Sequence, residues 1–336
     1  MGSLNTETAA ESFEKVSQYI GESVKRIPDG EVGRRFHWIL FQESYLESTK
    51  GLERVGNERI DYIGYDLRKF RIGDNVKPET IVIKNLGYAD AAIDSYSVFK
   101  EFKDSGHIGD NVRFQVSLQT PVAVVSTFVV DEDKVEVEKI YEKALLVEID
   151  RILEAVPEKE LAIQFDIAVE FSFIESVTIH DTDLADLWYG EDAIEDATSR
   201  IARIAANIPA DVEVGVHLCY GDVAEKHFVE PKDSTNLTKV ANSLARKFVR
   251  PLNWVHLPVP IERDDEDYFA PLRVLSLSKE TELYLGLIHR EDGKEGLNRR
   301  IKAAGSVLEE FGIATECGIG RHPKESIESV FKLHRV

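Results

Sequence analysis

The chain contains few of the residues that mark several common classes of protein. It has 2 cysteines and 11 prolines among 336 residues, which argues against a disulfide framework and a proline-rich linker. Its longest hydrophobic run, TPVAVVSTFVV (120–130), is much shorter than the roughly 20 residues that span a bilayer. The polar start MGSLNTETAAESF is unlike a secretory signal. We therefore expect a cytoplasmic protein that does not bind membranes.

Positive charge is also scarce. The sequence has 41 Lys and Arg against 61 Asp and Glu, which gives a formal net charge of -20. Proteins hold nucleic acids mainly through basic patches that release counterions from the phosphates, so we do not expect a nucleic-acid partner. The sequence does not indicate an oligomeric state.

No glycine-rich phosphate loop of the G-x-G-x-x-G or Walker type follows any apolar segment. Short apolar segments instead alternate with segments of helical spacing, such as residues 134–156 and 191–208. The candidate strands are residues 2–4, 80–86, 112–118, 161–168, 212–219, 252–259, 282–289 and 312–317. Apolar strands that alternate with amphipathic helices are typical of a parallel sheet covered by helices.

Eight strand–helix units predict a (β/α)8 TIM barrel, and the chain length fits a single domain over residues 1–336. An open doubly wound sheet is the alternative. The missing nucleotide-binding loops favour the barrel over that alternative.

Reactive side chains stand where the predicted strands end, which is where such barrels carry their chemistry. These residues are Asp166, His217, Cys219, His256, Glu262, His289, Glu316 and Cys317. Alternate residues of a strand point to the same side, so His217 and Cys219 share one face. An imidazole, two thiolates and a carboxylate suit a tetrahedral Zn²⁺. The competing interpretation is that both cysteines are small buried hydrophobic residues and the histidine a satisfied core residue.

The motifs GVHLCYGD (215–222), VPIERDDEDYF (259–269) and ATECGIGR (314–321) resemble the zinc-binding strands of cobalamin-independent methionine synthase. In that family the zinc activates homocysteine. The resemblance implies that His217, Cys219, Glu262 and Cys317 are the metal ligands. Glu262 is placed by its position alone, and His289 or Glu316 are alternatives for the fourth ligand.

The resemblance extends from about residue 80 to the end of the chain. It is closer to single-barrel, uncharacterised members of the uroporphyrinogen decarboxylase and methionine synthase superfamily, through RIPDGEVGRR (26–35), RFQVSLQTPVAV (113–124) and LYLGLIHREDG (283–293). Asp166 matches the aspartate of the family's Asp-Glu-Pro-Ala sequence, whereas Ile167 replaces the glutamate. The full synthase has an additional N-terminal barrel for its folate, so methionine synthesis itself is not expected.

The function expected from these residues is a zinc-dependent transfer of a methyl or alkyl group to a small thiol substrate. Asp166 and His289 are the predicted catalytic residues, which orient the substrate or move a proton. Arg34 and Arg35, with Glu31, are predicted to bind substrate, because paired arginines hold carboxylates or phosphates in bidentate fashion.

Two other functions stay open from the sequence. The first is a metal-free decarboxylase of the uroporphyrinogen decarboxylase type, in which Arg34 and Arg35 clamp carboxylates and Asp166 stabilises charge. The second is a barrel without enzymatic activity that stores metal or serves as a scaffold.

Overall fold

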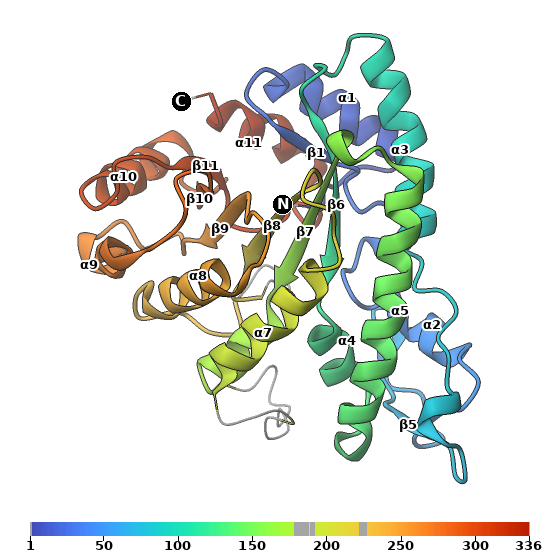
Figure 1. The fold of residues 1–336 in the computed structure, drawn as a ribbon. Coiled ribbons are helices and arrows are strands. Elements are labelled where there is room, and N and C mark those ends of the chain that lie inside the picture. The colour runs from blue at the N-terminus through green and yellow to red at the C-terminus, as the bar shows by residue number, and fades with distance from the viewer. Residues whose placement is uncertain (1, 178–187, 189–191, 222–226, 336) are drawn as a thin grey trace.

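The computed structural model describes residues 2–177, 188, 192–221 and 227–335, and at its centre lies a curled parallel sheet (Figure 1). The strand order is β1-β6-β7-β8-β9-β10-β11, so neighbours in the sheet follow one another along the chain. The strands are β1 (Arg26–Pro28), β6 (Arg113–Gln119), β7 (Leu161–Ile167), β8 (Glu213–Leu218), β9 (Trp254–Pro258), β10 (Glu282–Ile288) and β11 (Gly312–Thr315). This parallel α/β architecture agrees with the predicted fold class.

Helices cover the outer side of the sheet (Figure 1). The helices of the described residues are α1 (Ala9–Ile20), α2 (Gln42–Glu47), α3 (Tyr88–Asp104), α4 (Pro121–Phe128), α5 (Lys134–Ala155), α6 (Val169–Ile174), α7 (Ala193–Ala205), α8 (Thr235–Lys247), α9 (Glu266–Phe269), α10 (Gly293–Gly305) and α11 (Ile327–Leu333), of which α2 lies away from the sheet. The two predicted helical segments correspond to α5 and α7. The longest apolar run of the sequence forms the short helix α4. No helix in the described part of the chain is long and apolar enough to span a membrane.

One predicted strand, residues 80–86, is not part of the sheet, and a different segment takes its place. Residues 81–86, predicted as a strand, run extended without a ladder partner, although Ile81 and Ile83 are buried. The main chain of Leu86 bonds side chains instead, because Gln42 Nε2 donates to its carbonyl and Glu148 Oε1 accepts from its N–H. The strand beside β6 is β1, a segment that was not among the predicted strands.

The sequence predicted a closed barrel of eight strands, whereas the structure has a curled sheet of seven strands that does not close. The expected strand at residues 2–4 makes two isolated parallel bridges, Ser3 with Gly30 and Leu4 with Ile319. Within the described residues, the edge strands β1 and β11 do not pair with each other. Residues 3 and 4 therefore link the two edges of the sheet only through these bridges.

The strand register brings reactive residues together at one level of the sheet. All seven residues of β7 are buried, as expected for a strand covered on both faces. Asp166 of β7 pairs with His217 of β8, and His217 pairs with His256 of β9. These three residues thus lie side by side on adjacent strands.

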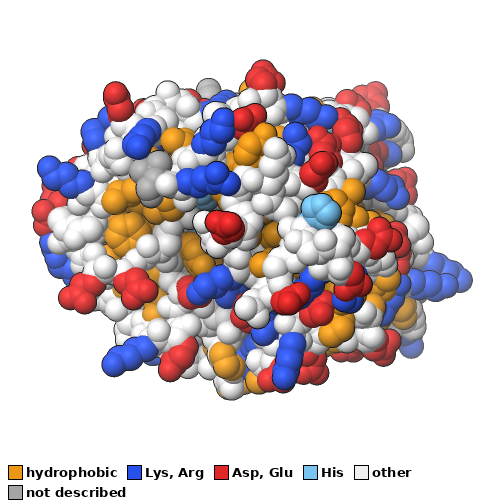
Figure 2. Space-filling view, turned by 90° about the horizontal axis from the view of Figure 1, so that it is seen from above, with side chains coloured by type: hydrophobic (Ala, Val, Ile, Leu, Met, Phe, Trp, Pro, Cys, Tyr) orange, Lys and Arg blue, Asp and Glu red, His pale blue; other side chains and the backbone are white. Residues whose placement is uncertain are grey.

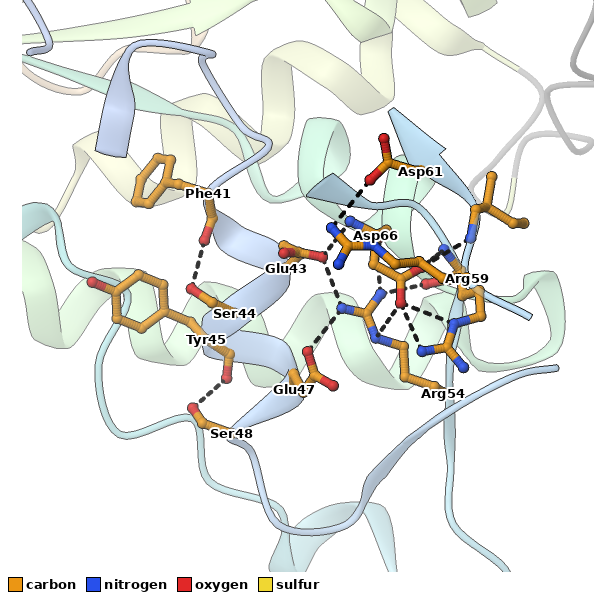
Figure 3. A network of polar contacts seen from close by, with 12 residues as sticks. Phe41, Glu43, Ser44, Tyr45, Glu47, Ser48, Arg54, Arg59, Asp61 and Asp66 are labelled. Carbon is orange, nitrogen blue, oxygen red and sulfur yellow. Dashed lines mark hydrogen bonds and ion pairs between the residues drawn. The ribbon is translucent and has the colours of Figure 1, made fainter. Parts of the chain in front are cut away.

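A long excursion follows β1 and packs against α2 (Figure 3). It contains the antiparallel pairs β2 (Leu52–Arg54) with β5 (Phe70–Ile72) and β3 (Asp61–Tyr62) with β4 (Tyr65–Asp66). Arg54 Nη2 lies 2.9 Å from Glu43 Oε2, and Arg54 Nη1 donates to the main-chain oxygen of Asp66 at 2.7 Å. The guanidinium thereby ties both hairpins to the helix.

Charged side chains of opposite sign pair at the amino ends of the strands. Arg26 bonds Glu213 and Glu282, and its guanidinium lies 4.2 Å above the ring of Trp254. Gly215 makes room for this indole, because a Cβ there would lie 2.0 Å from the ring. Acidic and basic side chains are likewise interspersed over the molecular face in Figure 2.

Candidate metal centre

Two separate strand ends bring three potential metal ligands together. His217 lies near the end of β8 and Cys219 just beyond it, while Cys317 follows β11. The Cys317 Sγ atom is 3.6 Å from Cys219 Sγ and 3.5 Å from His217 Nε2. Their ligand atoms all lie within 4.8 Å of one another, and they form the cluster of this kind found among the described residues. Asp222, the last residue of the motif GVHLCYGD, lies outside the described residues.

The two separations from Cys317 Sγ fit a tetrahedral zinc. With Zn–S bonds of about 2.3 Å and Zn–N bonds of about 2.05 Å, two sulfur ligands lie about 3.8 Å apart and a sulfur and a nitrogen about 3.6 Å apart. The measured separations of 3.6 Å and 3.5 Å are close to both values. Three protein ligands are also typical of catalytic zinc sites, which keep one position for water or substrate.

The surroundings of Cys317 favour the ionised form of its thiol. Its hydrogen bond with Cys219 lowers the pKa of Cys317 well below its ordinary value, and the hydrogen bond with His217 acts in the same direction against the effect of burial. Because the thiolate is the form that binds metals, this environment favours ligation.

A second imidazole lies behind His217. His256 Nδ1 is 2.7 Å from His217 Nδ1, and His256 Nε2 is 3.1 Å from the carbonyl oxygen of Thr315. Burial, together with the neighbouring His217, lowers the pKa of His256 well below its ordinary value, so this ring is neutral at pH 7. The sequence placed His256 near a strand end but assigned it no role.

Glu316 and His289 form a separate group beside Cys317. Glu316 Oε1 lies 3.1 Å from His227 Nε2, and Glu316 Oε2 lies 3.7 Å from His289 Nδ1. The other nitrogen of His289 donates to the carbonyl oxygen of Val259 at 2.8 Å. Burial raises the pKa of Glu316 to about 7 and lowers that of His289 to about 4. Both alternative fourth ligands therefore have other partners.

Asp166 and Glu31 place two buried carboxyl groups near the cluster. Gln164 Nε2 donates to Asp166 Oδ1 at 2.8 Å, and burial raises the pKa of Asp166. Burial and the charge of Asp166 raise the pKa of Glu31 to about 8. The Glu31 carboxyl lies against Gly2, where a Cβ would come 1.8 Å from its Oε1, so a larger residue at position 2 would require this carboxyl to move.

The two predicted arginines have separate surroundings. Arg35 pairs with the buried Asp29 at 2.5 Å, and Asp29 also accepts from Ser95 Oγ, so this guanidinium holds the loop after β1. Arg34 is exposed and donates to Ser44 Oγ at 3.1 Å. They do not form a paired clamp.

The predicted ligand Glu262 is not brought to the cluster. It follows β9 and is exposed, and its carboxylate is not among the ligand atoms that come together. The chain thus supplies three convergent ligands in this structure, where the sequence predicted four.

Three buried polar atoms at the carboxyl ends of the strands have no hydrogen-bond partner in the described structure. They are Oε1 of Gln119 at the end of β6, Oε2 of Glu170 at the start of α6, and the hydroxyl of Tyr220 beside Cys219. Buried polar groups are normally hydrogen-bonded, so such groups indicate sites that a ligand or water completes. In the sequence, these three residues are marked only by their position at or after strand ends.

No family model matches this chain, and no curated protein matches its sequence. Several solved structures share its fold, among them the following two. One is the "Putative Vitamin-B12 Independent Methionine Synthase" from Listeria monocytogenes, with a TM-score of 0.56 and 18% sequence identity over 97% of this chain and 86% of that chain. The other is a methyltransferase from Methanosarcina mazei, with a TM-score of 0.54 and 14% identity over 97% of this chain and 84% of that one. At these identities the likeness shows the fold alone.

Proposed function

We propose that this protein is a zinc-dependent enzyme that transfers a methyl or alkyl group to the sulfur of a small thiol. The observation that carries the proposal is the convergence of His217, Cys219 and Cys317, with both separations from Cys317 Sγ near those of a tetrahedral zinc site. The names of the two proteins with the same fold, a methionine synthase and a methyltransferase, support the same reaction class.

In this proposal His217, Cys219 and Cys317 would hold the zinc, which would activate the sulfur of the substrate thiol. Bound zinc lowers the pKa of a thiol and so presents a thiolate at neutral pH. The sulfur forms a bond to the alkyl carbon of the donor, and the donor's leaving group departs with the electron pair of the broken bond.

Asp166 is the proposed acceptor of the proton that the thiol releases. Its Oδ1 accepts from Gln164, which leaves Oδ2 for the substrate. Its register position beside His217 places it next to the ligand set. Glu31 is proposed to contact the polar part of the substrate, because its buried carboxyl has the charge of Asp166 nearby. His289 is proposed to act through Glu316, which it faces.

The arginines favour this reaction over the metal-free decarboxylase. A decarboxylase of that type needs guanidinium groups that clamp substrate carboxylates. Arg35 is occupied by Asp29, and Arg34 is exposed beside Ser44.

The proposal is tested by metal content and by transfer to a probe thiol. The purified protein is expected to hold close to one equivalent of zinc, because two thiolates bind zinc tightly at pH 7. Small probe thiols such as 2-mercaptoethanol, incubated with a sulfonium, a methylated pterin or a methyl corrinoid, are expected to yield a thioether, detected by mass spectrometry, from one of these donors. Cys219→Ser should abolish product and zinc, whereas the exposed-site control Lys239→Ser should retain both. Protein that holds no zinc after reconstitution, with both thiols freely titratable, would refute the proposal.

A further inference from the structure

His256 is a buried imidazole with a partner on each ring nitrogen. It lies in β9, where the register places it beside His217, and it is 2% exposed. Its Nδ1 faces Nδ1 of His217 at 2.7 Å, and its Nε2 faces the carbonyl oxygen of Thr315 at 3.1 Å. Both ring nitrogens of His256 are therefore engaged. Its Nδ1 meets the Nδ1 of His217, whereas the Nε2 of His217 faces Cys317.

These contacts determine which nitrogens carry hydrogen. A carbonyl oxygen only accepts, so Nε2 of His256 is the protonated nitrogen. The contact between the two Nδ1 atoms needs one donor and one acceptor, so in the tautomer of His256 protonated at Nε2 its Nδ1 is the acceptor. It must then receive the Nδ1–H of His217. His217 consequently directs Nε2 toward Cys317 Sγ, which is 3.5 Å away.

The same ring also connects two separate ligand segments. Thr315 is the last residue of β11, and its Oγ1 donates to the main-chain oxygen of Cys317 at 2.8 Å. His256 thus bonds the ring of His217, on β8, and the strand end that leads to Cys317. These contacts span the inside of the curled sheet, because β9 and β11 are separated by β10.

We infer that His256 is a positioning residue that sets His217 as an Nε2 ligand and holds the Cys317 segment at ligating distance. The inference rests on the proposed zinc site and deepens it, and His256 itself is not placed in contact with substrate. Partners of this kind commonly contribute about 10–100-fold to metal affinity.

Zinc affinity is the first test, measured by chelator competition. His256→Leu removes both hydrogen bonds and is expected to weaken zinc binding about 10–100-fold. His256→Gln should restore most of the affinity, because its amide can accept from His217 and donate to Thr315. The matched control is His334→Leu, which also loses a bond to a main-chain oxygen, that of Val330, but lies outside the cluster. This control should bind zinc as the wild type does.

Histidine tautomers supply a second readout that needs no variant and that a purely structural role would not predict. In uniformly ¹⁵N-labelled wild-type protein, long-range ¹H–¹⁵N correlations should show His256 protonated at Nε2 and His217 protonated at Nδ1. The zinc-loaded protein should show the shift of a metal-bound nitrogen at Nε2 of His217. A His256 ring protonated at Nδ1 would overturn the inference.

The outcomes separate this inference from the proposed function. If the wild type binds no zinc, the proposed function fails, and the tautomers of the metal-free protein still report on His256. If the wild type binds zinc and His256→Leu binds it within twofold of His334→Leu, the zinc site stands and the role of His256 is refuted. Should His256→Leu fail to fold, His256→Gln and the tautomer measurement decide the matter.

Discussion

The two ends of the same parallel strands shift the pKa values of acidic side chains in opposite directions. At the amino ends, Lys25 and Arg26 bond Glu282, and although burial opposes ionisation, these contacts hold the pKa of Glu282 below its ordinary value. At the carboxyl ends, burial raises the pKa of Glu31 to about 8 and that of Glu316 to about 7. The amino ends therefore stabilise the ionised form of their carboxyl groups, whereas the carboxyl ends disfavour it. Shifted pKa values of this kind are common at functional sites.

Hydrogen bonding shows the same contrast. Arg26 directs Nε to Glu213 and Nη1 to Glu282, so its charge is well matched. At the opposite end, Gln119, Glu170 and Tyr220 each keep a buried polar atom that has no partner within the described ranges. We infer that the amino ends serve stability and the carboxyl ends serve chemistry, and five variants test this division.

The largest effect is expected from Cys317→Ser at the carboxyl ends. Cys317 contacts both other cluster members, and replacing its thiolate leaves two ligands, so zinc should fall from about one equivalent to nearly none. Elemental analysis after gel filtration measures this loss. The fold should persist by circular dichroism, and a Cys317→Ser protein that still holds a full equivalent would break the proposed division.

Arg26→Met at the amino ends should lower the free energy of unfolding by about 1.5–3 kcal/mol, because it removes the contacts of Arg26 with Glu213 and Glu282, which keep Arg113 and Lys25 as partners. Urea denaturation followed by fluorescence measures the change. Zinc stoichiometry should not change under native conditions. Loss of zinc from a folded Arg26→Met protein would show that the two ends are not separate in function.

Glu31→Gln should change how stability depends on pH. Because the pKa of Glu31 is raised to about 8, its neutral form stabilises the fold, and that contribution is complete below its ordinary pKa and lost as the pH rises through about 8. The variant should therefore gain stability relative to the wild type at pH 9 and not at pH 4.5.

Glu282→Gln is the matched variant at the amino ends and should show the opposite sign. The lowered pKa of Glu282 means that its ionised form stabilises the fold above its ordinary pKa, so the variant should lose stability at pH 7 and less at low pH. Denaturation curves at three pH values give both results. Identical pH profiles for the two variants would contradict the contrast between the ends.

Glu262→Gln is expected to have the smallest effect. The residue is exposed and lies outside the ligand cluster, so zinc affinity should change less than about twofold and stability by about 0.5 kcal/mol at most. Chelator competition and urea denaturation check both values. A large loss of zinc would instead support the ligand role that the resemblance implied for Glu262.

Much of the fold follows from patterns within the sequence. Six predicted strands correspond to strands of the sheet, because buried parallel strands are near-continuous apolar runs that the helical segments separate. The strand at residues 26–28 could not be predicted, since three residues that end in proline carry no strand pattern. Residues 80–86 have that pattern, yet their main chain bonds side chains of Gln42 and Glu148.

The candidate site was predictable where a short motif carried its ligands. The two-residue spacing of His217 and Cys219 places both on one face, and Cys317 follows another strand. Glu262 was placed by distance along the chain, which does not determine where a loop side chain points. The contact between His256 and Thr315 depends on the curvature of the sheet, which no local pattern encodes.

Zinc K-edge X-ray absorption on the purified protein tests the central claim most directly. We predict a first shell with two sulfur atoms at about 2.3 Å and the remaining positions filled by nitrogen or oxygen. Addition of 2-mercaptoethanol as the probe thiol should raise the sulfur count from two to three. A zinc shell with fewer than two sulfur atoms, or a protein that takes up no zinc, would contradict the account.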